Sequence, residues 1–438
     1  MQYLYKIKKK LITYILLFLV ILVPVITFIL IHHYAVNVPF DDQYAMIPMI
    51  KSVLSGHIPF AALWAQHNEH RIFFPNVILL FLAMITRWSI IDEMYLSFII
   101  SCIGFTGLAF ILRRHIKNTN SYLLALLLSA AIFFSSIQWQ NWLWGWQLEW
   151  FLCLACILWS INLIDRLDNH TKLQNLIIPG LIAFIATFSL SSGMLGWFVC
   201  LAILIIRKFR SSHIIAWSIA TLVSIAVYFY HYTMPQDGLT QGAYLHQWNN
   251  AIKQYLALIG GSVSEDVHIA VFVGGYILIT FALLLIYTVK TRQIKRNIVP
   301  IGFGFITLVF GVMAVIGRFN IGILNAISSR YTAFSELIII AIIIMAITLF
   351  TEKRKRHANY THSFSLIVLI AVLLPIIFYS WLDGINGMQN QHKVNEYMYT
   401  CSRSLNPSPY CLNQVYFPSN QVAKSDLNYL KSKNLGGY

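Results

Sequence analysis

The chain is long, apolar and basic. Its 438 residues are 58% hydrophobic, have a mean hydropathy of +0.67, and include only 11% charged residues. A soluble globular protein carries about 25% charged residues, so this composition excludes an ordinary soluble domain. The net charge of +15 does not favour nucleic acid as a partner, because the basic residues lie in short clusters between apolar runs. No phosphate-binding loop, zinc-spaced Cys/His set or RNA-binding signature accompanies them.

Apolar runs close to twenty residues long recur along the chain, and this is the length that crosses about 30 Å of hydrocarbon. The first run, 11–31, follows a flank of four lysines. It is too long for a typical signal segment, so we predict an uncleaved first span. Ten later runs are predicted to span the membrane: 91–112, 120–137, 149–164, 175–190, 193–206, 213–232, 267–289, 298–317, 332–350 and 363–381.

The run 72–86 decides the topology, because it is short for a span and contains Pro75. If it does not cross, the predicted cytoplasmic segments hold 20 of the 31 Lys and Arg. If it crosses, sixteen of these residues move outside, against the positive-inside bias. We therefore predict an all-α, polytopic membrane protein with eleven spans, the N-terminus inside and the C-terminus outside. The spans 175–190 and 193–206 are a weak point, since merging them would invert everything downstream.

This topology divides the chain into a membrane domain, 1–381, with a first outer loop at 32–90, and a short outer tail, 382–438. Four cysteines lie in apolar runs and are predicted to be small buried hydrophobes. Cys401 and Cys411 flank a polar stretch of the tail, where an oxidising compartment would permit a disulfide. Three weaker features occur in the outer segments. The glycine-containing loop 233–266 is predicted to be mobile, and Glu265 and Asp266 are predicted to favour the start of the next span. Asp383 is predicted to lie in a solvated segment where the chain leaves the last span.

Two adjacent carboxylates, Asp41 and Asp42, follow the first span and open a helix-like stretch. One interpretation is that either residue simply caps an interfacial helix. The other is an acidic pair whose pKa values are pushed apart, so that one member acts as a general base. The spacing alone does not separate the two.

A second polar cluster runs from Gln66 to Arg71 and places His67, Glu69, His70 and Arg71 within five residues. Such a stretch is often a solvated loop, but the mixture of acid, base and cation favours a functional role. Binding of a divalent metal by His67, Glu69 and His70 stays open, because their spacing is not diagnostic.

Five of the twelve tryptophans lie between positions 139 and 150, at a predicted outer boundary. An aromatic belt explains some of them. The interleaved amides and Glu149 suggest a sugar, whose ring face stacks on indoles such as Trp142 and Trp146 while its hydroxyls form hydrogen bonds. Glu149 near the membrane surface is costly unless it is paired or functional.

Two arginines fall on the predicted outer face, against the positive-inside trend. Snorkelling accounts for Arg318. Arg330 sits among hydroxyl residues and heads an apolar helix, a position that suits a phosphate ligand because guanidinium and helix amides both bind phosphate.

The order of these parts resembles the GT-C superfamily of membrane glycosyltransferases, which use sugars linked to polyprenyl phosphate. The resemblance rests on the Asp41-Asp42 pair after a first span, on two helices at about 42–56 and 72–88, and on Glu149 after the third span. It covers about 1–350 in architecture. The Asn68-Glu69-His70-Arg71 element and the tryptophans also look like those of a group of bacterial membrane proteins without an established substrate. The soluble C-terminal domain of some superfamily members is missing.

The resemblance implies a bacterial inner-membrane enzyme. Such an enzyme would transfer a sugar from a polyprenyl-phosphate donor to a glycan, lipid or protein acceptor on the extracytoplasmic face. Asp41 or Asp42 would be the base, and Arg330, with Arg318 and Arg71, would bind the donor phosphate. Glu69, His70, Trp142, Trp146 and Glu149 would contact substrate, and no cofactor would be required beyond an optional divalent metal. The alternatives are a lipid-linked glycan polymerase or ligase with arginine-led chemistry, and a flippase.

Overall fold

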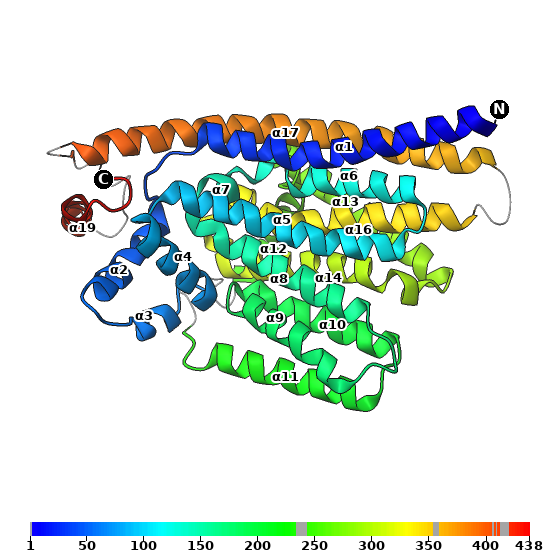
Figure 1. Cartoon of the computed structure of the whole chain (residues 1–438), viewed down its shortest axis with the longest axis horizontal. Coiled ribbons are helices and arrows are strands. Elements are labelled where there is room, and N and C mark those ends of the chain that lie inside the picture. Colours follow the sequence, from blue (N-terminus) through cyan, green and yellow to red (C-terminus); the bar gives the residue numbers. More distant parts are fainter. Residues whose placement is uncertain (1, 234–242, 354–358, 405–406, 409, 412–419) are drawn as a thin grey trace.

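The chain folds into a bundle of helices, shown by a computed structural model (Figure 1). The structure describes residues 2–233, 243–353, 359–404, 407–408, 410–411 and 420–438, and these contain no β-strand. The long helices are α1 (Gln2–Tyr34), α5 (Ile90–His115), α6 (Thr119–Phe133), α8 (Leu148–Asp165), α9 (Ile177–Thr187), α10 (Met194–Ile206), α11 (Ser211–Phe229), α12 (Ala243–Gly260), α13 (Val267–Lys290), α14 (Ile294–Arg318), α16 (Thr332–Lys353) and α17 (Asn359–Arg403).

Short helices carry the connections between them. Those nearest the candidate site are η1 (Asp41–Ala45), α2 (Met46–Leu54), α3 (Phe60–Trp64), α4 (Phe73–Thr86), η2 (Ser136–Gln138), α7 (Trp139–Leu143), η3 (Gly145–Gln147), η6 (Phe319–Ile321), α15 (Ile323–Ala326), η7 (Ser329–Tyr331) and α19 (Asn420–Lys433). The predicted helical segment 72–88 is the 14-residue α4. The predicted stretch 42–56 is divided between η1 and α2.

The apolar helices agree with a multi-pass membrane protein. Within the described residues, eight helical segments are long and apolar enough to cross a membrane. Two further predicted spans correspond to the shorter apolar helices α9 and α10. The last predicted span, 363–381, lies in α17, and its side chains up to position 370 fall outside those described.

The centre of the bundle is α16. Its apolar window is completely buried, and its sequence is apolar on every face from Leu337 to Ile347. A helix that is apolar all round has to be enclosed by other helices. The helices α6, α12, α13, α14 and α17 pack around α16 and enclose it.

The expectation of a mobile loop at 233–266 is wrong over most of its length, because α12 occupies 243–260; residues 234–242 lie outside the described part. Two glycines explain how α12 packs against α13. A Cβ on Gly260 would lie 1.9 Å from the Ala270 carbonyl oxygen, and a Cβ on Gly274 would lie 2.0 Å from that of Leu256. The backbones of α12 and α13 are therefore in direct contact, as in small-residue helix pairs of membranes.

The polar segments gather at the two ends of the bundle, as the charge count predicted. At one end, Asp165 accepts hydrogen bonds from Arg114 and Arg207. These bonds join three segments that are all predicted to be cytoplasmic. The first-loop helices α2, α3 and α4 lie at the opposite end, together with the C-terminus (Figure 1). The N-terminus lies at the same end as Asp165.

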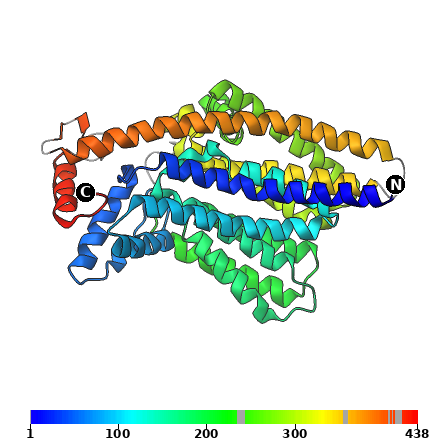
Figure 2. The same cartoon turned by 45° about the horizontal axis from the view of Figure 1, so that its top comes forward.

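The tail 382–438 does not begin at a structural boundary, because α17 continues through it to Arg403. This 45-residue helix is about 68 Å long at 1.5 Å per residue, far more than the hydrocarbon requires. It runs along the whole bundle in both views (Figure 2). Asp383 is not a solvated exit: its carboxylate accepts hydrogen bonds from the backbone of Glu265 and from Ser264.

Beyond α17 the chain turns back onto the first loop. Cys401 and Cys411 form the expected disulfide. In α19, Asp426 pairs with Lys51 of α2 at 2.9 Å. The last residues reach the start of α5, where the Gly436 amide donates to the carbonyl of Arg87 at 3.1 Å. The tail therefore braces the first loop from outside.

The α12–α13 contact generates a stability prediction. We expect Gly274→Ala to lower the free energy of unfolding by about 1–3 kcal/mol, because its Cβ would overlap the Leu256 carbonyl and force the helices apart. Gly275→Ala is the matched control, since nothing lies within 4 Å of its added Cβ. Thermal unfolding of the two purified variants in detergent measures the difference. Equal melting temperatures would contradict the direct backbone contact.

Candidate active site

The acidic pair lies in the tight turn that follows α1. Asp41 has a positive φ of 46°, a left-handed conformation that is uncommon outside glycine and recurs at functional sites. The prediction that Asp41 or Asp42 caps the following helix is wrong. The side chain of Gln43 does this instead, because its Oε1 accepts the Phe40 amide at 2.9 Å. Both carboxylates are therefore available for other contacts.

A buried hydrogen-bond network fixes this turn to the bundle. Gln43 donates to Glu93 of α5 at 2.6 Å, and the indole of Trp88 donates to the other oxygen of Glu93 at 3.0 Å. Gly145 packs directly on this pair, since a Cβ there would lie 2.3 Å from the Glu93 carboxylate. Trp144 then donates to the Phe40 carbonyl at 3.0 Å. The acidic turn is thus held between α5 and the tryptophan-rich segment.

The two carboxylates have different electrostatic surroundings. Partial burial raises the pKa of Asp41, as does the negative charge of Asp42; Arg330 and His67 oppose this only in part. Burial alone would also raise the pKa of Asp42. The contact with His67, at 3.4 Å, and the positive charges of His67, Arg330 and Arg318 outweigh burial and lower it. The pKa values of the two carboxylates therefore differ, and Asp41 has the higher pKa.

The polar cluster 66–71 is a tight reverse turn rather than a solvated loop. His67 and His70 exchange two backbone hydrogen bonds of 2.8 Å, and Asn68 at the tip has a φ of 49°. The turn directs Glu69 at Arg318, whose Nε and Nη2 lie 2.7 and 2.6 Å from Glu69 Oε1. Arg318 is consequently held by an ion pair, and snorkelling does not describe it.

His70 is a neutral imidazole at ordinary pH. Burial lowers its pKa to about 4, although the neighbouring Glu69 opposes the shift. Its Nδ1 accepts the amide of Ser191 at 3.4 Å, and its Nε2 lies 3.5 Å from Glu69 Oε1. His67 and His70 thus face different carboxylates. Across the described residues, no group of three His, Cys, Asp or Glu side chains is gathered to hold a metal ion.

Arg71 is bonded to backbone and does not line the larger cavities at this end of the bundle. Its side chain is 4% exposed, and it donates to the backbone carbonyls of Trp64, Tyr228 and Tyr230. These bonds tie the first loop to the end of α11. The structure therefore gives Arg71 a positioning role.

The tryptophan-rich segment holds the arginine segment in place. Gln140 accepts hydrogen bonds from the Ser328 hydroxyl at 2.7 Å and from the Arg330 amide at 3.2 Å. Asn141 donates to the Arg330 carbonyl at 3.1 Å. Two of the interleaved amides, which suggested sugar binding in the sequence, thus bind the segment around Arg330.

A cavity of about 570 Å³ lies where these segments meet. It combines carboxylates, an arginine and aromatic rings; its walls are formed by Phe40, Asp41, Trp139, Gln140, Trp144, Glu265, Leu324, Asn325, Ile327, Ser328, Ser329 and Arg330. Such a mixture of flat rings and a few convergent polar groups is typical of a small-molecule site.

One hydrogen-bond donor of Arg330 has no acceptor in the described part of this region. Its Nη2 donates to Asn325 Oδ1 at 3.3 Å, but its Nε is buried without a hydrogen-bond partner among the described residues. A buried N–H without a partner is costly, so it calls for an explanation. Because Arg330 lines the cavity, its guanidinium can pair there with an anionic ligand.

The structure places the predicted aromatic contacts differently. Trp142 is fully buried and stacks on Phe151 at 4.4 Å, while Trp146 is 2% exposed and lies beside His67. Neither lines the cavity; Trp139 and Trp144 do. All five indoles look equivalent in the sequence, and only their three-dimensional placement distinguishes those that reach the cavity.

Two further carboxylates belong to this region. Glu149, at the first turn of α8, is 6% exposed and lies within electrostatic range of Asp42, Glu69, Arg318 and Arg330. Glu265 was expected only to favour a helix start, and Asp266 alone does this by accepting two amides of α13. Glu265 lines the cavity, where its carboxylate accepts the Trp139 indole N–H.

Glu265 generates a prediction about pH. Burial raises its pKa to about 7, although the Trp139 hydrogen bond opposes the shift. Because the folded protein holds this proton more tightly than the unfolded chain, the resulting stability is present below the unfolded pKa of 4.5 and is lost as pH rises through 7. We expect Glu265→Gln to raise the melting temperature at pH 8 more than at pH 5. Asp92→Asn, outside the cavity walls, is the control; a pH-independent effect of Glu265→Gln would contradict the raised pKa.

Comparison of the chain with family models, with curated proteins and with solved structures finds no match in any of the three. A function for the site therefore has to be argued from the residues themselves. What they establish is one end of an all-helical membrane protein where carboxylates, arginines and indoles from five separate segments converge.

Proposed function

We propose that this protein is a membrane glycosyltransferase that transfers a sugar from a polyprenyl-phosphate donor to an acceptor of the cell envelope. The observation that carries the proposal is the placement of Asp41 and Arg330 on the walls of one aromatic cavity. A base and a phosphate ligand are the two groups that this transfer requires. The accompanying indoles suit a sugar ring.

In the proposed reaction Asp41 removes the proton of the acceptor hydroxyl or amine. The acceptor then attacks the anomeric carbon, the bond between that carbon and the phosphate oxygen breaks, and polyprenyl phosphate leaves with inversion. Arg330 offsets the negative charge that develops on the phosphate. Asp42 is a positioning residue, because its contact with His67 keeps it ionised beside Asp41 and so raises the pKa of the base.

The surface near the cavity supports a lipid-linked donor. Leu324 lines the cavity and is 74% exposed, and the neighbouring Ile321 is 53% exposed. Apolar side chains beside a polar cavity allow a polyprenyl tail to remain in the lipid while its head group enters. In the proposed topology of eleven spans, this cavity lies on the extracytoplasmic face of the bacterial inner membrane.

An arginine-led polymerase or ligase is the second candidate, and the buried unpartnered Nε of Arg330 favours it. The ion pair between Arg318 and Glu69 weakens it, because that arginine already has an anionic partner. The two candidates differ in which residue matters more. A base-led transferase depends most on Asp41, whereas arginine-led chemistry depends most on Arg330.

Donor turnover tests the proposal. With labelled polyprenyl-phosphate hexoses and pentoses, we expect Asp41→Asn to lower sugar transfer or release by about 10²–10⁴-fold, the usual contribution of a general base. Arg330→Lys should lower it too, because an ammonium cannot replace bidentate guanidinium contacts. Asp92→Asn, outside the cavity walls, should behave as wild type. Equal turnover by wild type and Asp41→Asn would reject the base-led mechanism.

Cysteine labelling tests the proposed sidedness. Ile58→Cys lies in the first loop, where Ile58 is 85% exposed, and Lys117→Cys lies in the basic segment at the other end of the bundle. We expect an impermeant maleimide added to intact cells to label only Ile58→Cys. Labelling of Lys117→Cys alone would place the cavity on the cytoplasmic face.

A further inference from the structure

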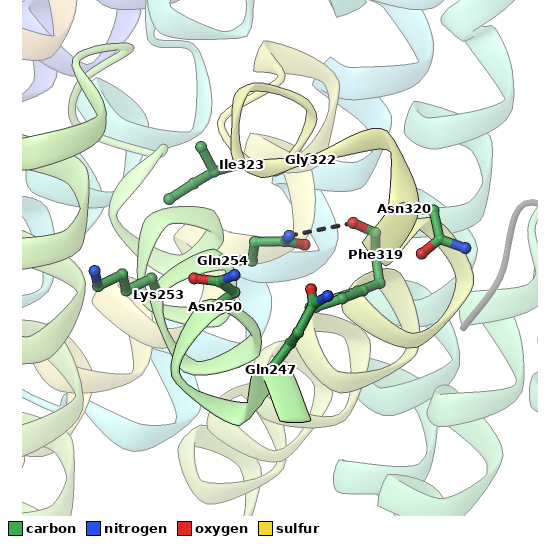
Figure 3. A pocket seen from close by; sticks show the side chains of 8 residues that line it. All are labelled: Gln247, Asn250, Lys253, Gln254, Phe319, Asn320, Gly322 and Ile323. Carbon is green, nitrogen blue, oxygen red and sulfur yellow. Dashed lines mark hydrogen bonds between the residues drawn. The ribbon is translucent and has the colours of Figure 1, made fainter. Parts of the chain in front are cut away.

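A second cavity, of about 500 Å³, lies beside the candidate active site. It opens between one face of α12 and the turn formed by η6 and the start of α15 (Figure 3). Asn250 and Gln254 face it from one side of α12, four residues apart, and Gln247, at a kink of the helix, lines it as well. This polar stripe lies in the segment 233–266, which the sequence predicts to be a mobile loop.

Carboxamides dominate the chemistry of this cavity. Each carboxamide offers two N–H donors and one carbonyl acceptor, so the stripe can bind groups that both donate and accept. Asn320 adds another amide and Lys253 a cation, and in the view of Figure 3 these two extend toward opposite sides. The described lining contains no carboxylate. Sugar hydroxyls have this same dual hydrogen-bonding character.

Contacts and backbone geometry of the lining residues maintain this cavity. Gln254 is 6% exposed and donates to the Phe319 carbonyl at 3.2 Å, a bond drawn in Figure 3 that fixes the turn against α12. Gly322 has a φ of 98°, a conformation that side chains rarely adopt, and nothing lies within 4 Å of the position of a Cβ. The turn therefore bends away from α12 without filling the space.

The same chain segment separates this cavity from the candidate active site. Ile323 lines the α12 cavity, whereas the next residue, Leu324, lines the cavity that contains Asp41 and Arg330. A small gap of about 10 Å³ is lined by Gln254 from the first cavity and by Asn325 from the second. The two cavities are consequently adjacent.

We propose that the α12 cavity is a sugar-binding subsite that holds a neutral sugar residue of the acceptor glycan while its reacting end lies near Asp41. This assignment of the acceptor as a carbohydrate rests on the proposed glycosyltransferase function. The amides of Gln247 and Asn250 bind sugar hydroxyls, and Ile323 contacts the apolar ring face. A lipid or protein acceptor would not need this amide stripe.

The subsite can be tested by ligand binding without any donor. The probes are methyl glycosides of glucose, galactose, mannose, rhamnose and N-acetylglucosamine. Their binding to the full-length protein in nanodiscs is measured by saturation-transfer-difference NMR. We expect signal from at least one glycoside, and an at least fivefold loss in Asn250→Trp, which fills the cavity. Asn249→Trp is the matched control, because Asn249 is exposed and is not part of the lining.

A double variant, Gln247→Ala with Asn250→Ala, removes the amides without adding bulk and should cause the same loss. Unchanged signals in Asn250→Trp and in the double variant, or no signal from any glycoside with wild type, would overturn the subsite. Donor turnover is read separately. If Asp41→Asn leaves turnover unchanged while Asn250→Trp abolishes glycoside binding, the subsite stands and the proposed mechanism fails; the reverse result rejects the subsite alone.

Discussion

The arrangement of the site depends on one buried hydrogen bond, from Gln43 of the first loop to Glu93 of α5. Both side chains are almost completely buried, so the loss of either partner would leave a polar group without water or protein to bind it. Trp88 satisfies the second oxygen of Glu93, and Gly145 packs directly on the pair. The first loop is thereby fixed to the bundle two residues from Asp41.

The tryptophan-rich segment acts as a scaffold between the two halves of the site. On one side Trp144 binds the backbone of the acidic turn, and on the other Gln140 and Asn141 bind the backbone around Arg330. Asp41 and Arg330, separated by almost 290 residues, are thus held by neighbouring residues of one short segment. Backbone contacts of this kind set position without consuming the functional groups, which is what preorganisation requires.

The charges of the site are distributed between two pairs with different roles. Glu69 and Arg318 bind each other closely, and Tyr228 and Tyr232 hold the backbone of Glu69, so this pair contributes rigidity. Asp41 and Arg330 both line the cavity, and the Nε of Arg330 is buried without a partner in the described part of the chain. The pair with unfilled bonding capacity is the one suited to a ligand.

Much of the architecture was predictable from the sequence, because the hydrocarbon thickness fixes span length and the positive-inside bias groups the basic loops. Eight of the predicted spans coincide with helices long and apolar enough to cross a membrane, and Asp41, Asp42, Glu69, His70, Glu149, Arg318 and Arg330 do gather at one end. Tertiary structure alone decided which residues face the cavity. Side chains of equal type, such as Trp139 and Trp142, differ only in the direction their short helix presents them. The sequence did not predict helix α12 for a related reason. Its packing depends on Gly260 and Gly274, whose close backbone contact forms only when two helices meet.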